Sequence, residues 1–220
     1  MGERETKDAQ PDCVVPAVDA SGDGPGPTQQ YQRARRPGRG TVQTWEAWLK
    51  GAEYEVAEAL RDGRPFKIRA LRPDDRDGLL AALGRSSAQS LYRRFFSPKH
   101  DFTEEQIAYF VNIDFIDHVA LVAVLEEEGR CVIIGGGRYI VVQPGKAEVA
   151  FVVVDQYQRQ GIGAALMRHL ATIARDAGLE ELIAEVLADN ISMLKVFQKS
   201  GLRLSTTHEA GVAHVVLQLA

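Results

Sequence analysis

The clearest pattern of hydrophobic and polar residues lies in the middle of the chain, where an apolar run leads into an amphipathic segment. Residues 147–154 are mostly apolar and rich in branched side chains, which is typical of a buried strand. The segment 163–177 repeats apolar residues at helical spacing. Gly161 and Gly163 stand at the strand-to-helix turn. Because the first turn of a helix leaves backbone N–H groups unpaired and carries the positive end of the helix dipole, the sequence predicts an anion-binding turn here.

The chain from Pro65 onward alternates strand and helix patterns. Thr103, followed by Gln106 three residues later, forms a capping box that predicts the start of a helix. This order of elements predicts an α/β or α+β domain with a mixed sheet. Strands are expected at 65–71, 117–125, 130–142, 147–154, 180–187 and 213–219, and further helices before 83, around 90–96 and at 190–199.

The N-terminal part has a different composition. Residues 1–43 hold more than half of the nine prolines and few large apolar side chains, so we expect a disordered arm. At 44–63 the apolar residues recur at steps of three and four, which predicts an amphipathic helix ending at Gly63. The residues that carry this pattern are Trp45, Trp48, Leu49, Ala52, Val56, Ala59 and Leu60.

Composition excludes several classes of protein. The chain has 220 residues, of which 45% are hydrophobic and 25% charged, with a formal net charge of -4, so nothing global favours nucleic acid as a partner. Two distant cysteines, Cys13 and Cys131, indicate neither a disulfide framework nor a metal site. Because no signal peptide and no apolar run of about 18 residues is present, we expect a cytoplasmic protein without a membrane partner.

The spacing of the glycines separates several kinds of anion-binding turn. Gly163 is followed by Ala164, Ala165 and Leu166, which fits neither the dinucleotide-binding fingerprint nor the Walker loop. The run Gln158-x-x-Gly161-x-Gly163 instead resembles the coenzyme A pyrophosphate loop of the GNAT (Gcn5-related) N-acetyltransferase superfamily. The segment 190–202 is similar to the second acyl-CoA segment of that superfamily.

This resemblance covers residues 66–220 and implies a mixed, mostly antiparallel central sheet flanked by helices. It also implies acetyl-CoA as the co-substrate and no metal. Within the superfamily, the segments 90–96 and 114–118 are similar to bacterial protein lysine acetyltransferases. Those relatives acetylate, and thereby inactivate, AMP-forming acyl-CoA synthetases at an active-site lysine, so the implied partner is such a synthetase.

The transfer of an acetyl group to lysine needs a base, because a lysine amine with a pKa of about 10.4 is protonated at neutral pH. Glu148 is the only acid inside the strand that leads into the glycine turn, and burial would raise its pKa toward a useful range. The superfamily places a glutamate base at this point of the strand. A solvated charge at the start of the strand is the alternative. Asp117 and His118 are the next candidates.

Most of the remaining site is expected to be backbone. The resemblance assigns pantetheine to the main chain of three valines, with a backbone N–H near Val153 stabilising the oxyanion. Each of these residues also has a structural interpretation. The valines could simply form a core strand, Arg159 could be an exposed surface residue, and Asn190 could cap the next helix. The complete set of implied coenzyme-binding residues is Val152, Val153, Val154, Gln158, Arg159, Gln160, Gly161, Ile162, Gly163, Ala164 and Asn190.

One residue departs from the superfamily pattern. Phe197 stands where many members carry a tyrosine that protonates the leaving thiolate, and phenylalanine has no proton to give. Two other functions therefore stay open: an acetyltransferase for a small amine such as a polyamine or an aminoglycoside, and a non-catalytic acyl-CoA sensor. Arg93 and Arg94 suit either recognition of an acidic protein surface or an exposed helix face. We expect a monomer or a weak dimer.

Overall fold

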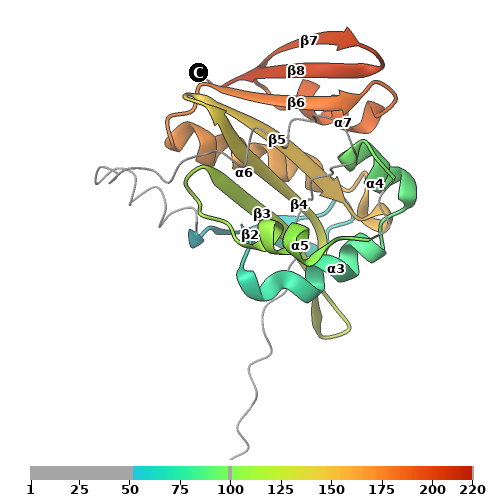
Figure 1. Ribbon diagram of the computed structural model, residues 1–220. Helices are drawn as coiled ribbons and strands as arrows, with labels where there is room; N and C mark the ends of the chain where they lie inside the picture. The colour runs from blue at the N-terminus through green and yellow to red at the C-terminus, as the bar shows by residue number, and fades with distance from the viewer. Residues whose placement is uncertain (1–51, 99–100, 220) are drawn as a thin grey trace, which may run out of the picture.

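The computed structural model describes residues 52–98 and 101–219, which form one eight-stranded sheet flanked by helices (Figure 1). The strands are β1 (Glu55–Ala59), β2 (Pro65–Ala70), β3 (His118–Glu127), β4 (Arg130–Gln143), β5 (Lys146–Val153), β6 (Glu181–Leu187), β7 (Arg203–Glu209) and β8 (Val212–Gln218). Their order in the sheet is β1-β2-β3-β4-β5-β6-β8-β7. The β5–β6 pair is parallel and the other pairs are antiparallel, which confirms the predicted mixed, mostly antiparallel sheet.

The helices occupy the connections that the sequence pattern predicts. They are the short η1 (Pro73–Asp75) and η2 (Asp155–Tyr157), and α3 (Arg76–Gly84), α4 (Ala88–Phe95), α5 (Glu104–Val111), α6 (Ile162–Asp176) and α7 (Ile191–Gln198). The capping box of α5 is present, because Thr103 Oγ1 accepts from the Gln106 N–H and the Gln106 side chain accepts from the Thr103 N–H. The described residues contain no helix that is both long and apolar enough to cross a membrane.

A helix is predicted over 44–63, but the structure shows that residues 55–59 form the strand β1, so the prediction is wrong for these residues. Glu55 pairs with Arg69 and Ala59 with Pro65, so β1 and β2 form an antiparallel hairpin at the edge of the sheet. Burial alternates along β1, with Val56 and Glu58 less exposed than their neighbours. The apolar spacing of this short segment is compatible with either a helix or a strand. Pairing with the edge of the sheet therefore decides its conformation. Residues 44–51 and the predicted arm 1–43 lie outside the described residues.

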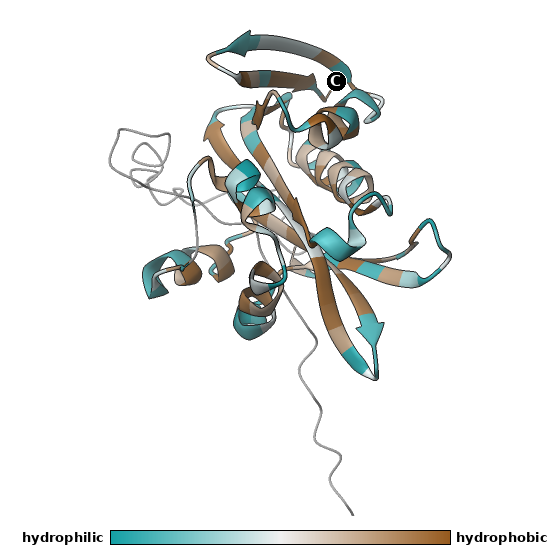
Figure 2. Ribbon diagram, turned by 90° about the vertical axis from the view of Figure 1, so that its right-hand side faces the viewer, coloured by the Kyte–Doolittle hydropathy of each residue, from teal (hydrophilic) through white to brown (hydrophobic). Residues whose placement is uncertain are grey.

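Two helical layers cover the sheet. A Cβ atom at Gly137 of β4 would lie 3.0 Å from the Leu170 side chain, so α6 packs on the face to which Gly137 points. The next residue, Arg138, reaches Phe110 of α5 on the opposite face. The central strands between these layers carry mainly apolar residues, whereas the hairpin ends are polar (Figure 2). The core is therefore continuous across both faces of the sheet.

The N-terminal hairpin is fixed to α6 by a polar cluster. Tyr54 Oη lies 2.5 Å from His169 Nδ1, and His169 Nε2 lies 2.8 Å from Glu58 Oε1. Arg168 Nη2 also donates to Glu58 Oε1 at 2.5 Å. The β1–β2 turn then reaches the end of the glycine loop, where the Arg61 N–H donates to the Gln160 carbonyl oxygen at 3.2 Å. The folded unit therefore includes this hairpin and begins before residue 66.

Candidate active site

The parallel strands β5 and β6 stay together only at one end. Their ladder consists of Lys146–Glu148 opposite Glu181–Ile183. Beyond that point β5 runs on to Val153 beside β4, while β6 runs on to Leu187 beside β8 (Figure 1). Glu148 is thus the last residue of β5 paired with β6 before the two strands separate.

The separated edge of β5 presents main-chain groups. The Val154 N–H donates to the Ile134 carbonyl oxygen of β4 at 3.1 Å. Because backbone groups alternate between the two neighbours of a strand, Val152 is also directed toward β4, whereas Val153 and Phe151 face the side of β6. Of the three predicted valines, therefore, Val153 offers its main chain to the separated edge.

The predicted strand-to-helix turn forms a cradle of backbone donors. Gly161 has a φ of 99° and precedes α6, and a Cβ atom at this position would meet no atom within 4 Å. Within the described part of the chain, the N–H groups of Gly161, Ile162, Gly163 and Ala164 donate to no other residue. Arg159 lies beside them, exposed and with a φ of 63°. The turn therefore has the geometry of an anion site, and its occupant stays a prediction.

Gln158 takes part in a different way from the residues that follow it. Its side-chain Nε2 donates to Ser90 Oγ of α4 at 3.0 Å and to the Val153 carbonyl oxygen at 3.2 Å. The amide nitrogen is thus engaged within the protein. Gln158 thus links the start of the loop to α4 and to the end of β5.

Glu148 lies on the sheet face that α5 covers. Cross-strand pairing places His118, Ile140 and Glu148 in one row, and Ala120, Arg138 and Ala150 in the next. Directly opposed residues share a face of the sheet, and Arg138 is the diagonal neighbour of Glu148 on that face. The backbones of such diagonal pairs are about 7–8 Å apart. Glu148 is half-buried and Arg138 is 2% exposed. The candidate base therefore stands beside a buried cation.

The structure also places the two other candidate bases, His118 and Asp117. Burial first, and then the charge of Arg138, hold the pKa of His118 well below its usual range, so this imidazole is neutral at neutral pH. Burial, followed by the nearby Asp114, raises the pKa of Asp117. Asp117 also precedes β3, outside the row that contains Glu148. Of the three candidates, Glu148 is the one at the fork between β5 and β6, whereas His118 is buried on β3, two strands away.

Asn190 and Phe197 both belong to α7. Asn190 Oδ1 accepts from the Met193 N–H at 3.3 Å, which makes Asn190 the cap of this helix. Phe197 is 1% exposed, and its ring centroid lies 6.1 Å from that of Phe151. The residue that replaces the expected tyrosine is therefore part of the core beneath the separated edge.

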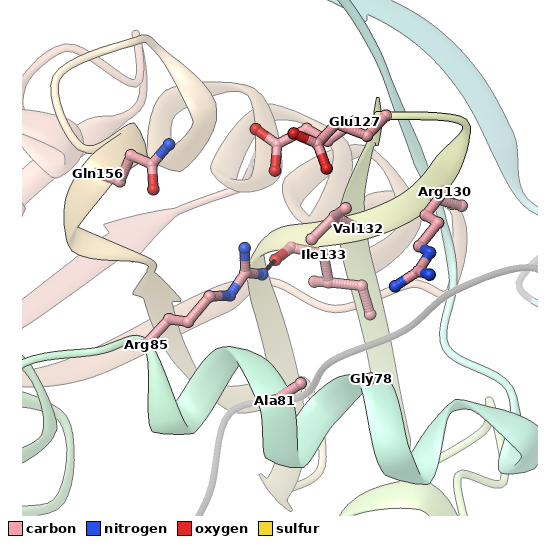
Figure 3. A pocket seen from close by; sticks show the side chains of 10 residues that line it. Gly78, Ala81, Arg85, Glu127, Arg130, Val132, Ile133 and Gln156 are labelled. Carbon is pink, nitrogen blue, oxygen red and sulfur yellow. Dashed lines mark hydrogen bonds between the residues drawn. The ribbon is translucent and has the colours of Figure 1, made fainter.

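A hollow of about 710 Å³ lies apart from this site (Figure 3). It is bordered by α3, by the β3–β4 hairpin and by Gln156, and it includes neither Glu148 nor the glycine cradle. Arg85 points across it from α3 and donates to the Ile133 carbonyl oxygen at 2.5 Å. The Tyr157 hydroxyl donates to Glu127 at the rim. These contacts tie the hairpin to α3 and η2, so we assign the hollow a structural role.

An open strand edge that ends at a backbone anion cradle, with a carboxylate at the fork, defines a site for an extended anionic ligand. The family model described as the Acetyltransferase (GNAT) family matches residues 86–202. An acetyltransferase of Pseudomonas aeruginosa is 32% identical over 137 residues, which cover 62% of this chain and 74% of that protein. Acetyltransferase Pat of Mycolicibacterium smegmatis is 35% identical over 146 residues, which cover 64% of this chain and 42% of Pat.

Solved structures agree with these matches. The GNAT domain of S. lividans PAT is 33% identical, with a TM-score of 0.68, over 74% of this chain and 96% of that domain. A cAMP-binding acyltransferase from Mycobacterium smegmatis is 26% identical, with a TM-score of 0.53, over 90% of this chain and 54% of that protein. The chain therefore belongs to the GNAT acetyltransferase family and is an acyl-transfer enzyme. It spans about half the length, or less, of Pat and of the cAMP-binding acyltransferase.

Proposed function

We propose that this enzyme transfers the acetyl group of acetyl-CoA directly to a lysine of a protein substrate, with Glu148 as the general base. The observation that carries the proposal is the position of Glu148 at the fork between β5 and β6. From that point the separated edge of β5 leads directly to the glycine cradle. A thioester laid along this edge lies between the fork and the cradle when its phosphates occupy the cradle.

The cradle fits the pyrophosphate of coenzyme A. Its N–H groups are open, the Gly161 position leaves room for a phosphate, and α6 contributes the positive end of its dipole. Arg159 supplies a positive charge beside these donors. Along the edge, the Val153 N–H is suited to pair with the extended pantetheine arm and to stabilise the oxyanion that develops during acyl transfer.

Glu148 accepts the proton that the lysine amine must lose before it attacks the thioester carbon. The attack forms the C–N bond, and collapse of the tetrahedral intermediate breaks the C–S bond. The buried Arg138 lies on the same face of the sheet as Glu148. Since Phe197 has no proton to donate, the leaving thiolate, whose usual pKa is about 8.5, takes its proton from solvent or from the ammonium group of the tetrahedral intermediate.

The proposed acceptor is the active-site lysine of an AMP-forming acyl-CoA synthetase. The relatives named Pat and PAT support a protein substrate. Tyr92 on α4 is 44% exposed, Phe96 at the C-terminal cap of α4 is 36% exposed, and Ile191 at the start of α7 is 53% exposed. Arg93 of α4 pairs at 3.1 Å with Asp189, which lies just before α7, so the two helices are linked here. Exposed aromatic side chains of this kind are typical of protein contacts.

The test is acetyl-CoA turnover by the purified chain with an AMP-forming acetyl-CoA synthetase, a polyamine panel, or no acceptor. A single acetylated synthetase lysine, identified by mass spectrometry, supports the proposal. Turnover with amines alone would assign a small-molecule acetyltransferase. Glu148→Gln should keep the affinity for coenzyme A and lose about 100- to 10,000-fold in turnover.

A matched control is Glu185→Gln. Glu185 is an exposed acid on β6 that pairs with His214 at 3.5 Å and lies outside the row of Glu148. This variant should retain wild-type turnover. Full activity of Glu148→Gln would refute the assignment of the base.

A further inference from the structure

Asp155, which no motif singled out, joins α4 to the glycine loop. Its Oδ2 accepts from the Ser87 N–H at 2.8 Å. Its Oδ1 accepts from Ser87 Oγ at 2.8 Å and from Ser90 Oγ at 2.9 Å. One carboxylate at the start of η2 thus holds the first turn of a helix that lies far away in the sequence.

The same hydrogen bonds continue into the proposed acyl-CoA site. Ser90 Oγ donates to Asp155 and accepts from Gln158 Nε2, which also donates to the Val153 carbonyl oxygen. Gln158 is the first residue of the glycine motif, and Val153 is the last residue of the separated edge. A chain of hydrogen bonds therefore runs from α4 through Ser90 to both parts of the site.

The other end of α4 is held on the opposite side of the fork. Arg93 Nη2 donates to Asp189 Oδ2 at 3.1 Å, in the connection between β6 and α7. One end of α4 therefore contacts the segment after β5, and the other contacts the segment after β6 (Figure 1). The helix spans the opening between the two strands.

We infer that Asp155 and Ser90 are positioning residues of the acyl-CoA site, acting through Gln158 on the pyrophosphate loop. The inference rests on the proposed binding of coenzyme A. Gln158 lies next to Arg159, whose left-handed backbone turns the chain into the cradle. Fixing the Gln158 side chain sets where this turn begins and hence where the N–H groups of the cradle point. The Gln158 side chain also donates a hydrogen bond to the Val153 carbonyl oxygen. The Val153 N–H is then the main-chain group of Val153 that can pair with a ligand.

The arrangement explains how a carboxylate is tolerated beside an anion site. Burial would raise the pKa of Asp155, but the donors from Ser87 and Ser90 outweigh it and lower the pKa. The carboxylate is therefore ionised at neutral pH, and its hydrogen bonds direct the charge toward the N-terminus of α4. A helix N-terminus stabilises a nearby negative charge.

The experiment measures the dissociation constants of coenzyme A and of pantetheine, which lacks the nucleotide and its phosphates, by NMR titration. Ser90→Ala should weaken coenzyme A binding by about 5- to 20-fold, which at 1.4 kcal/mol per tenfold is about 1–1.8 kcal/mol and lies within the cost of losing hydrogen bonds. Pantetheine binding should change by less than about twofold. Ser90→Thr keeps the hydroxyl and should restore the affinity for coenzyme A.

Ser86→Ala is the matched control, because Ser86 Oγ donates only to the Ala82 carbonyl oxygen within α3, at 3.0 Å. It should bind both ligands as the wild type does. Unchanged coenzyme A binding by Ser90→Ala, or an equal loss for coenzyme A and pantetheine, would overturn the inference. If the wild type fails to bind coenzyme A, the proposed function falls and this inference falls with it.

Discussion

Gly137→Ala should destabilise the protein, because the added methyl group has no room. An ideal Cβ atom at Gly137 would lie 2.6 Å from Phe151 Cδ1, 2.8 Å from Phe151 Cε1 and 3.0 Å from Leu170 Cδ1. Normal carbon contacts are about 3.5–4.0 Å, so the Phe151 ring must move by roughly 1 Å. That ring is 8% exposed and packs against Phe197. It cannot turn away as the end of a flexible side chain would.

Overpacking of this kind costs about 1–3 kcal/mol. For a domain of this size each kcal/mol lowers the melting temperature by about 2–4 °C, so Gly137→Ala should melt roughly 2–12 °C below the wild type. Urea unfolding followed by circular dichroism measures the free energy directly. Gly84→Ala is the control: no atom lies within 4 Å of its Cβ position at the end of α3, so it should be neutral or stabilising by up to about 1 kcal/mol. Wild-type stability of Gly137→Ala would refute the packing argument.

Three further outcomes are expected. His118→Asn should leave the pH–rate profile between pH 6 and 8 unchanged, because His118 is already neutral there; loss of a limb in the profile would show that it titrates during turnover. Gly161→Val should raise the KM for acetyl-CoA at least about tenfold, since it places methyl groups in the cradle and forces a β-branched residue to a φ of 99°; an unchanged KM would place the phosphates elsewhere. Glu58→Gln should be less stable than the wild type at pH 7. Burial alone would raise the pKa of Glu58, but its hydrogen bonds to His169 and Arg168 have the larger effect, so its pKa in the folded protein is below the usual value. Its stabilisation is therefore present above the unfolded pKa of about 4.5 and is lost as the pH falls through the lower folded pKa, so urea unfolding should show the two proteins converging in acid.

Local signals in the sequence were reliable where neighbouring residues decide the structure. The glycine turn is an example, since Gly161 adopts a left-handed conformation that other residues avoid. The Thr103–Gln106 capping box is another, because its hydrogen bonds span three residues. Such interactions form within one turn of the chain, and their residue types can therefore be read in order.

The same reasoning failed at residues 55–59, where β1 replaces the predicted helix. Its apolar spacing allows a helix, but the hydrogen bonds that β1 makes with β2 depend on an edge that exists only once the sheet has formed. The polar cluster of Tyr54, His169 and Glu58 then fixes the hairpin on α6 across more than a hundred residues. No local pattern indicates such a contact.

The sequence by itself determined the order of strands and helices from β2 to α7, the left-handed turn at Gly161 and the choice of Glu148 as the candidate base. Only the tertiary structure decided that β5 and β6 separate immediately after Glu148, and that Arg138 is buried beside it. It also decided that Asp155 and Ser90 join α4 to the glycine loop. The physical reason is that local conformation depends on nearby residue types, whereas strand pairing and buried polar contacts depend on groups that only folding brings together.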